Sequence, residues 1–258
     1  MSGYGPEAVD LAKNGGSLLI NMGTLNNESI DNYLQALRAY NAKGNPVVFD
    51  PVGAGATDIR REAAKHLLAG GYFDLIKGNE SELIQVYGKI PGRGRQAGVD
   101  SGPSTLNSKE KAQLVKDLSR RERNVVLLTG TVDYLSDGER TLAIGNGHEL
   151  LSCITGTGCI IGTMAASFLA VHRSDKLLAV LSSLLTLEIA AERAAVKDGV
   201  NGPGTFLPAL IDELYALRKW AVERKKGGAS TETLNGDTAS GVHENIFRKM
   251  AKVHLIPM

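Results

Sequence analysis

A repeated alternation of short apolar runs and longer stretches with helical spacing constrains the fold of this chain more than any other feature. Four of the apolar runs have the length and composition of strands: residues 18–22, 47–49, 73–76 and 125–128. After the first run, Ile30, Leu34 and Leu37 recur at intervals of four and three, as on one face of a helix. Strands that alternate with helices predict an α/β fold with a mainly parallel central sheet and helices on both faces.

The second half of the chain follows a different pattern. Residues 132–136 and 141–144 are predicted to form a β-hairpin around Asp137 and Gly138. Beyond this hairpin, the apolar spacing predicts three helices, at residues 157–171, 175–197 and 206–224. The middle helix is rich in Leu and Ala, so we expect it to be buried.

Two polar stretches separate or follow these elements. Residues 88–108 are rich in Gly, Pro, Ser and Asn, which predicts a surface loop. Residues 225–241 are small and polar and offer few apolar side chains for packing. We therefore expect one domain over residues 1–225 and a polar, largely disordered tail over residues 226–258.

Composition argues against several classes of protein. The 258 residues carry a formal net charge of +1, so no strong basic field would attract nucleic acid or anionic lipid. The two cysteines, Cys153 and Cys159, are too few and too close for a disulfide framework, which indicates a reducing compartment. No apolar run approaches the ~20 residues of a membrane span. We therefore expect a cytoplasmic protein with a small-molecule ligand.

Polar residues that directly follow the predicted strands are candidates for a site, because ligands bind beyond the carboxyl ends of parallel strands. Asp50 ends the second apolar run, and Gly53 and Gly55 behind it would let the backbone approach a ligand closely. An Asp at a strand end is as often a helix cap or a turn former. Position alone leaves both interpretations open.

Two further strands end in the same way. Lys77 could neutralise a phosphate, and Glu82 could hold Mg²⁺ directly or through water. A capped helix start, with acids favoured by the helix dipole, explains the same residues equally well. Thr129 could reach a phosphate oxygen, although a simple turn is favoured when this segment is taken alone.

The sharpest local signal is the segment from Gly156 to Cys159, which runs straight into a predicted helix. Glycines at a helix N-terminus expose backbone N–H groups, and the helix dipole adds positive potential, so the segment can hold a transferring phosphoryl group. Cys159 would lie in the first helical turn, where the dipole favours the thiolate. It could then accept or orient a substrate proton, but a free Cys is most often a small buried hydrophobe.

Two familiar nucleotide-binding motifs do not account for these segments. The chain has no Gly-x-x-x-x-Gly-Lys-Ser/Thr sequence, which excludes a P-loop NTPase. Gly156 and Gly158 superficially suggest a dinucleotide fingerprint, but they lie late in the chain and do not open a βαβ unit.

Six stretches, taken together and in this order, resemble the hydroxyethylthiazole kinases, a branch of the ribokinase-like superfamily. They are INMGTLN (20–26), NPVVFDPVGAGATDIR (45–60), LIKGNESEL (75–83), LLTGTVDYLSDG (127–138), NGHELL (146–151) and TGTGCIIG (155–162). The resemblance implies a ribokinase-like fold and Mg²⁺-dependent transfer of the ATP γ-phosphate to the hydroxyl of 4-methyl-5-(2-hydroxyethyl)thiazole. The product would be the thiazole phosphate used in thiamine biosynthesis and salvage.

The resemblance also implies roles for individual residues. These are Lys77, Asn79 and Thr129 for ATP, Asp50 and Glu82 for Mg²⁺, Gly156 and Met1 for the thiazole, and Gly156, Thr157, Gly158 and Cys159 for the anion hole. Cys159 stands where most ribokinase relatives carry an Asp base. A thiol is a poorer base at neutral pH, which predicts modest turnover.

The family pattern has further consequences for assembly. Family members begin with an additional strand and helix that this chain lacks, which predicts an open sheet edge. The resemblance extends to the kinase part of fungal fusions with thiamine-phosphate synthase, and it implies a homotrimer. Two alternatives are a ribokinase-like kinase for another small alcohol, which would more often carry Asp in place of Cys159, and a catalytically impaired nucleotide-binding remnant.

Overall fold

The computed structural model describes residues 4–26, 28–88, 105–226 and 246–257. The chain divides into two compact units: residues 1–145, 158–183 and 253–258 form the first, and residues 146–157 and 184–252 form the second. The loop predicted over residues 88–108 lies mostly outside the described residues. None of the described helices combines the length and the apolar character needed to cross a membrane.

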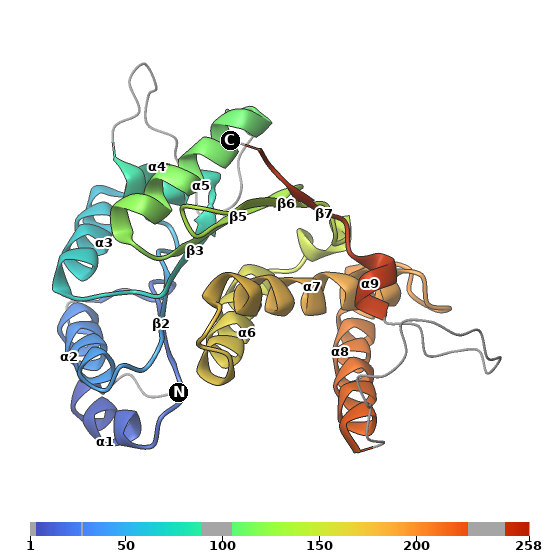
Figure 1. Cartoon of the computed structure of the whole chain (residues 1–258), viewed down its shortest axis with the longest axis horizontal. Coiled ribbons are helices and arrows are strands. Elements are labelled where there is room, and N and C mark those ends of the chain that lie inside the picture. Colours follow the sequence, from blue (N-terminus) through green and yellow to red (C-terminus); the bar gives the residue numbers. More distant parts are fainter. Residues whose placement is uncertain (1–3, 27, 89–104, 227–245, 258) are drawn as a thin grey trace. The chain divides into compact units, whose positions relative to one another are not determined.

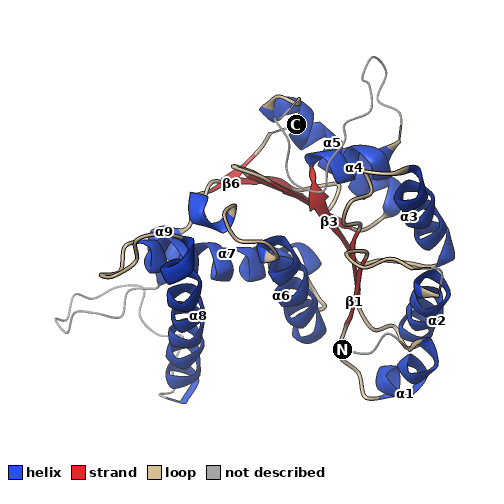
Figure 2. Ribbon diagram, turned by 180° about the vertical axis from the view of Figure 1, so that it is seen from behind, coloured by secondary structure: helices blue, strands red, loops and turns tan. Residues whose placement is uncertain are grey.

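The first unit is built on a seven-stranded sheet whose strands lie side by side in chain order (Figure 2). The strands are β1 (Leu18–Asn21), β2 (Val47–Asp50), β3 (Leu75–Asn79), β4 (Val125–Thr129), β5 (Asp133–Ser136), β6 (Thr141–Ile144) and β7 (Val253–Leu255). β1 to β4 are parallel, whereas β4 to β7 pair antiparallel. The predicted parallel core and the predicted hairpin, β5 with β6, are both confirmed.

Helices lie on both faces of this sheet, as the alternating pattern predicted (Figure 1). One layer consists of α1 (Ala8–Lys13), α2 (Ser29–Ala42), α3 (Asp58–Gly70), α4 (Glu80–Tyr87) and α5 (Ser108–Glu122). The other face carries α6 (Thr157–Val171). α7 (Lys176–Ala195) begins in the first unit and ends in the second.

Alternate side chains of the strands point to opposite faces of the sheet, and those of one face determine how closely α6 packs against β1 and β2. Ile20 is buried with Leu37 of α2 in the main hydrophobic core. Leu19, its neighbour, points the other way, where a Cβ added at Gly162 of α6 would stand 3.3 Å from Leu19 Cδ1 and 3.6 Å from Asp50 Oδ2. The small residue at position 162 therefore lets the start of α6 approach the carboxyl ends of β1 and β2.

The second unit contains the short 3₁₀ helix η2 (Glu149–Leu151), the end of α7, α8 (Pro203–Lys226) and α9 (Ile246–Met250). Glu213 of α8 pairs with Arg193 Nε and Lys197 Nζ of α7 and the turn after it, both at 2.6 Å. Burial alone would raise the pKa of Glu213, but hydrogen bonds from these two cations outweigh it and lower the pKa. These ion pairs tie α7 to α8.

The last residues of the chain depart from the disordered tail expected over residues 226–258. Residues 227–245 lie outside the described part, but β7 pairs with β6, with Val253 opposite Ile144. β6 would otherwise present an unpaired backbone edge, and a short segment is enough to satisfy those N–H and C=O groups. The polar composition of the preceding stretch concealed this strand.

Candidate active site

Polar side chains at the carboxyl ends of β1, β2 and β3 meet the first turn of α6. The register pairs Asn21 of β1 with Asp50 of β2. Asn21 Nδ2 donates to Asp50 Oδ2 at 2.9 Å and to Cys159 Sγ at 3.2 Å. Lys77 Nζ of β3 lies 3.3 Å from both carboxylate oxygens of Asp50. The fold thus brings the predicted acid, the predicted lysine and the predicted thiol into one cluster.

The Asp50–Lys77 pair is buried. Asp50 has no exposed surface and Lys77 is 5% exposed. Burial raises the pKa of Asp50 above its ordinary value, and this effect outweighs the opposing influence of Lys77 and the hydrogen bond from Asn21. A buried ion pair is stable only when short, well-aligned hydrogen bonds compensate for the lost hydration. The two contacts of 3.3 Å between Lys77 and Asp50 are long for charge-assisted hydrogen bonds, so this pair is incompletely compensated.

Glu82 is held at the start of α4 by a capping box with Asn79. Asn79 Oδ1 accepts from the Glu82 N–H at 2.9 Å, and Glu82 Oε2 accepts from the Asn79 N–H at 2.8 Å. The other carboxylate oxygen, Oε1, accepts from the Gly53 N–H at 2.9 Å. Burial raises the pKa of Glu82 despite these two donors. The capped helix start is therefore confirmed, and Glu82 also links the loop after β2 to β3.

The N-terminal turn of α6 faces the ion pair. A Cβ added at Gly158 would stand 3.2 Å from Lys77 Nζ, so a larger residue would crowd the lysine. Cys159 is half-buried, and its Sγ accepts from Asn21. Backbone N–H groups of the first helical turn have no partner within the helix, and together with Lys77 they supply positive potential at one place.

The remaining predicted residues are distributed as follows. Thr129 ends β4 next to Asn79 of β3, and its hydroxyl donates weakly to the Gly78 carbonyl at 3.4 Å. Gly156 and Thr157 belong to the second unit; Gly156 has a φ of +98°, and the Thr157 hydroxyl is bonded to backbone carbonyls of the preceding turn. Met1 lies outside the described residues.

Asn21 is the site residue that our reading of the sequence did not single out. The rule that identified Asp50, a polar residue at the end of an apolar strand, applies to Asn21 as well. Its amide orientation follows from its partners, because Oδ1 accepts from the Gly23 N–H at 2.8 Å and Nδ2 faces a carboxylate. A neutral side chain carries less chemical signal than an acid or a lysine, which is why it was overlooked.

The donor set fits a divalent ion that is only partly held by protein. No three His, Cys, Asp or Glu side chains among the described residues form a cluster suited to a metal ion. Mg²⁺ commonly takes one or two carboxylates and completes its shell with water and substrate phosphates. Asp50 can serve in this way, whereas both oxygens of Glu82 already accept backbone N–H bonds.

Comparison with known proteins shows to which family the chain belongs. The hydroxyethylthiazole kinase family model matches residues 1–219. Hydroxyethylthiazole kinase from Moorella thermoacetica is 40% identical over 211 residues, covering 82% of this chain and 76% of the relative. The enzyme of the same name from Pyrococcus furiosus is 39% identical over 220 residues, covering 85% of this chain and 79% of the relative.

Solved structures give the same result. The structure of a hydroxyethylthiazole kinase protein from Pyrococcus horikoshii OT3 matches with a TM-score of 0.77 and 32% identity, covering 100% of this chain and 84% of that one. A ribokinase-like superfamily protein from Enterococcus faecalis matches with a TM-score of 0.57 and 12% identity, covering 82% and 66%, and shows the likeness of fold alone. The expected ribokinase-like fold is confirmed, and the chain belongs to the hydroxyethylthiazole kinase family.

Proposed function

We propose that this chain transfers the γ-phosphate of ATP to the hydroxyl of 4-methyl-5-(2-hydroxyethyl)thiazole, in a reaction that requires Mg²⁺. One observation carries the proposal beyond family membership. The buried Asp50–Lys77 pair is connected through Asn21 to a thiol in the first turn of a glycine-lined helix. This arrangement brings an acid, a cation and a thiol together, and such a combination is suited to phosphoryl transfer.

Lys77 and the start of α6 are the groups suited to the phosphate. Lys77 is held by Asp50 through two long contacts, so a phosphate oxygen can compete for its ammonium group. Gly158 places no side chain in the space beside Nζ, and N–H groups at a helix start are suited to bind a phosphate there. As the transferring group loses its bond to ADP, these fixed donors would stabilise the charge on its oxygens.

Cys159 is the group suited to the substrate proton. The hydroxyl oxygen of the thiazole substrate would attack phosphorus, and the bond from phosphorus to the ADP oxygen would break. The hydroxyl proton would pass to Cys159 Sγ, which would act as a thiolate after releasing its own proton to water. The hydrogen bond from Asn21 Nδ2 to Sγ would stabilise this thiolate before the substrate proton arrives. Position rather than basicity would supply most of the acceleration.

Asp50 would hold Mg²⁺, directly or through water, and Glu82 would add negative charge nearby while it keeps its two backbone N–H bonds. When bound, the ion would neutralise charge on the phosphates and orient them for displacement. Burial has raised the pKa of both carboxyl groups, so bringing a cation to them favours their charged forms.

The other predicted roles complete this proposal. Thr129 and Asn79 would contact ATP, since they lie opposite each other at the carboxyl ends of the neighbouring strands β4 and β3. Gly156 and Met1 would line the thiazole site, and Gly156 and Thr157 would extend the anion hole of Gly158 and Cys159. A homotrimer, a fusion with thiamine-phosphate synthase and a cytoplasmic location are carried over as further parts of the proposal.

An assay with ATP, Mg²⁺ and hydroxyethylthiazole tests the proposal, with thiazole phosphate and ADP quantified by mass spectrometry. We expect equal amounts of the two products and no product when EDTA replaces Mg²⁺. Pyrimidine and sugar alcohols are assayed in parallel. Faster turnover of one of them would replace the proposed substrate, and ATP binding without any turnover would indicate an impaired nucleotide-binding protein.

A further inference from the structure

Arg60, in the first turn of α3, joins the loops that follow β1 and β2. Its Nη1 donates to the carbonyl of Met22 at 2.6 Å and to that of Val52 at 2.8 Å, and its Nη2 donates to the carbonyl of Gly23 at 3.1 Å. Met22 and Gly23 directly follow β1, and Val52 comes two residues after the end of β2. A rigid guanidinium is suited to hold several acceptors at fixed spacing.

The local sequence directs the arginine to this position. Thr57 caps α3, and its hydroxyl accepts from the Arg60 N–H at 3.3 Å, which fixes the first turn. Gly53 has a φ of +72°, and a Cβ added there would stand 3.1 Å from Arg60 Cδ. Glycine at position 53 therefore allows both the left-handed turn and the passage of the arginine side chain.

The loop that Arg60 holds controls the orientation of Asn21. Gly23, whose carbonyl is bonded to Arg60, donates its N–H to Asn21 Oδ1 at 2.8 Å. With Oδ1 fixed in this way, Nδ2 of the same amide must face Asp50 and Cys159. A chain of direct contacts thus runs from the guanidinium through Gly23 and Asn21 to the thiol.

The second loop extends the same influence to the acidic side of the site. Gly53, which packs against the arginine stem, donates its N–H to Glu82 Oε1. Tyr33 adds support to the first loop, because its hydroxyl shares one proton between the carbonyls of Asn21, at 3.2 Å, and Thr24, at 3.4 Å. Arg60 is the described side chain that contacts both loops through hydrogen bonds to their carbonyls.

We propose that Arg60 is a positioning residue for phosphoryl transfer, which acts through Gly23 and Asn21 to aim the Asn21 amide at Cys159 and Asp50. The inference rests on the proposed function for its catalytic consequence. It does not require Arg60 to touch ATP, the thiazole or the transferring phosphate. Its effect should therefore appear in turnover rather than in nucleotide binding.

Kinetics of the full chain test this role with three variants. Arg60→Met removes all three hydrogen bonds and should lower kcat about 10- to 100-fold with the KM for ATP changed less than about 3-fold. Arg60→Lys keeps a cationic donor but loses the planar fork, so it should retain a kcat between that of Arg60→Met and that of the parent. Lys65→Met, an exposed lysine on the same helix that pairs only with Glu62 in the described structure, is the charge-matched control.

A double-mutant cycle separates positioning from general destabilisation. If Arg60 acts through Asn21, Arg60→Met should reduce kcat by less than about 3-fold in an Asn21→Ala background. Multiplicative losses in the double variant would overturn the proposal. So would a rise in the KM for ATP that matches the fall in kcat, or a normal kcat in folded Arg60→Met.

Amide hydrogen exchange supplies a readout that does not depend on activity. Arg60→Met should speed exchange of the Gly23 N–H about 10-fold or more, while Lys65→Met leaves it unchanged. If Arg60→Met does not fold, Arg60→Lys carries both measurements, and an unchanged Gly23 exchange rate and kcat would refute the role. Should the parent chain transfer no phosphate, the proposed function fails, while the exchange rate still decides whether Arg60 holds the loop.

Discussion

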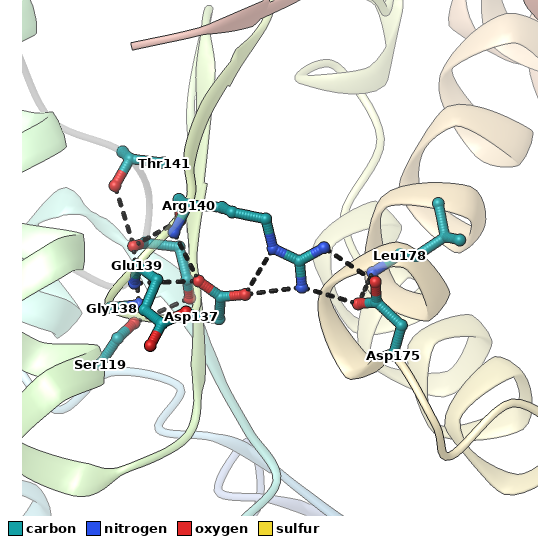
Figure 3. A network of polar contacts seen from close by, with 9 residues as sticks. Ser119, Asp137, Gly138, Glu139, Arg140, Thr141, Asp175 and Leu178 are labelled. Carbon is teal, nitrogen blue, oxygen red and sulfur yellow. Dashed lines mark hydrogen bonds and ion pairs between the residues drawn. The ribbon is translucent and has the colours of Figure 1, made fainter. Parts of the chain in front are cut away.

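Two clusters of the first unit each pair a basic side chain with aspartate, but the pKa of the aspartate shifts in opposite directions. In the first, Arg140 of the β5–β6 turn lies between Asp137 and Asp175 (Figure 3). Its guanidinium contacts Asp175 with two parallel bonds of 2.8 and 2.9 Å and Asp137 Oδ2 at 2.7 Å. The cluster is partly open to solvent, with 48% of the Arg140 side chain exposed.

Charge is well matched in this first cluster, and the pKa values reflect it. Hydrogen bonds from Arg140, followed by the Leu178 N–H, lower the pKa of Asp175 to about 2. Bonds to Asp175 and Asp137 raise the pKa of Arg140. The charged forms of Arg140 and Asp175 both gain from their neighbours, so the cluster has no need of a ligand.

The Asp50–Lys77 cluster is different because its charges are buried with long contacts. The pKa of Asp50 is raised, since burial outweighs the attraction of Lys77. A site that stays under-compensated in the free protein can gain from a bound metal ion and phosphate. The comparison teaches that the direction of the pKa shift, more than the presence of an ion pair, separates the candidate site from structural charge.

Removing Lys77 should have the largest effect of any single change. We expect Lys77→Met to lower kcat/KM for ATP by about 10² to 10³-fold, because a fixed cation at the transferring group is lost. Binding of the thiazole should weaken much less. Arg140→Met is the matched control, since it also removes one paired cation, and its kcat/KM should stay within about 3-fold of the parent value.

These values come from steady-state kinetics with each substrate varied in turn, and from calorimetric binding of ATP. Equal losses for ATP and thiazole in Lys77→Met would contradict the phosphate role. A large loss in Arg140→Met would erase the distinction between the two clusters.

Replacing the thiol should have the next largest effect. Cys159→Ala should lower kcat by about 10²-fold, because the proton acceptor in contact with Asn21 is lost. Cys159→Asp should retain or raise kcat, since a carboxylate is the better base at neutral pH. Cys153→Ala, at an exposed cysteine, is the control and should leave kcat unchanged.

Burst and steady-state rates of ADP formation would measure these changes. Background activity in Cys159→Asp, together with a normal thermal unfolding curve, would contradict a proton-accepting role for this position.

The pH dependence of stability should have opposite signs at the two clusters. The raised pKa of Asp50 means that its contribution to folding is fully present below the ordinary carboxyl pKa and is lost as pH rises through the raised value. The lowered pKa of Asp175 means that its contribution is present above the ordinary value and is lost as pH falls toward about 2.

Urea unfolding of the parent, Asp50→Asn and Asp175→Asn between pH 2.5 and pH 7, about the range over which carboxyl groups titrate, measures this difference. Relative to Asp50→Asn, the parent should lose stability as pH rises. Relative to Asp175→Asn, it should gain stability as pH rises. The same sign at both positions would remove the electrostatic distinction.

Much of this arrangement could be predicted from local sequence because it depends on strand ends. Asp50 and Lys77 each follow an apolar run, and the parallel pairing of β2 with β3 then brings both residues to the carboxyl ends of adjacent strands. Asn21 obeys the same rule but carries no charge, so its role follows only from its contacts with Asp50 and Cys159 in the folded chain. The contact with Cys159 joins residues that are 138 positions apart in the sequence, and a local sequence pattern cannot predict a contact between such distant segments.

The end of the chain was harder for a related reason. β7 is three residues long, and it exists because β6 offers an unpaired edge, which is a tertiary property. The network around Arg140 was likewise hidden, because Asp175 lies 35 residues away from it. Sequence patterns locate strands and the residues at their ends, whereas partners supplied by distant segments follow only from the folded chain.

Weakening the Arg140 network should have the smallest effect and should act on stability alone. We expect Arg140→Met to lower the free energy of unfolding by about 1 kcal/mol, the upper end for exposed ion pairs, because the contact with Asp175 is bidentate. More than a third of the Arg140 side chain is exposed, so high salt screens its ion pairs in the parent protein. The difference in unfolding free energy between the parent and Arg140→Met should therefore be smaller in high salt. Urea unfolding at low and high NaCl measures both values. A loss that is larger than this and independent of salt would mean that the Arg140 pairs are screened from solvent as the buried Lys77 is, and exposure would then not separate the two clusters.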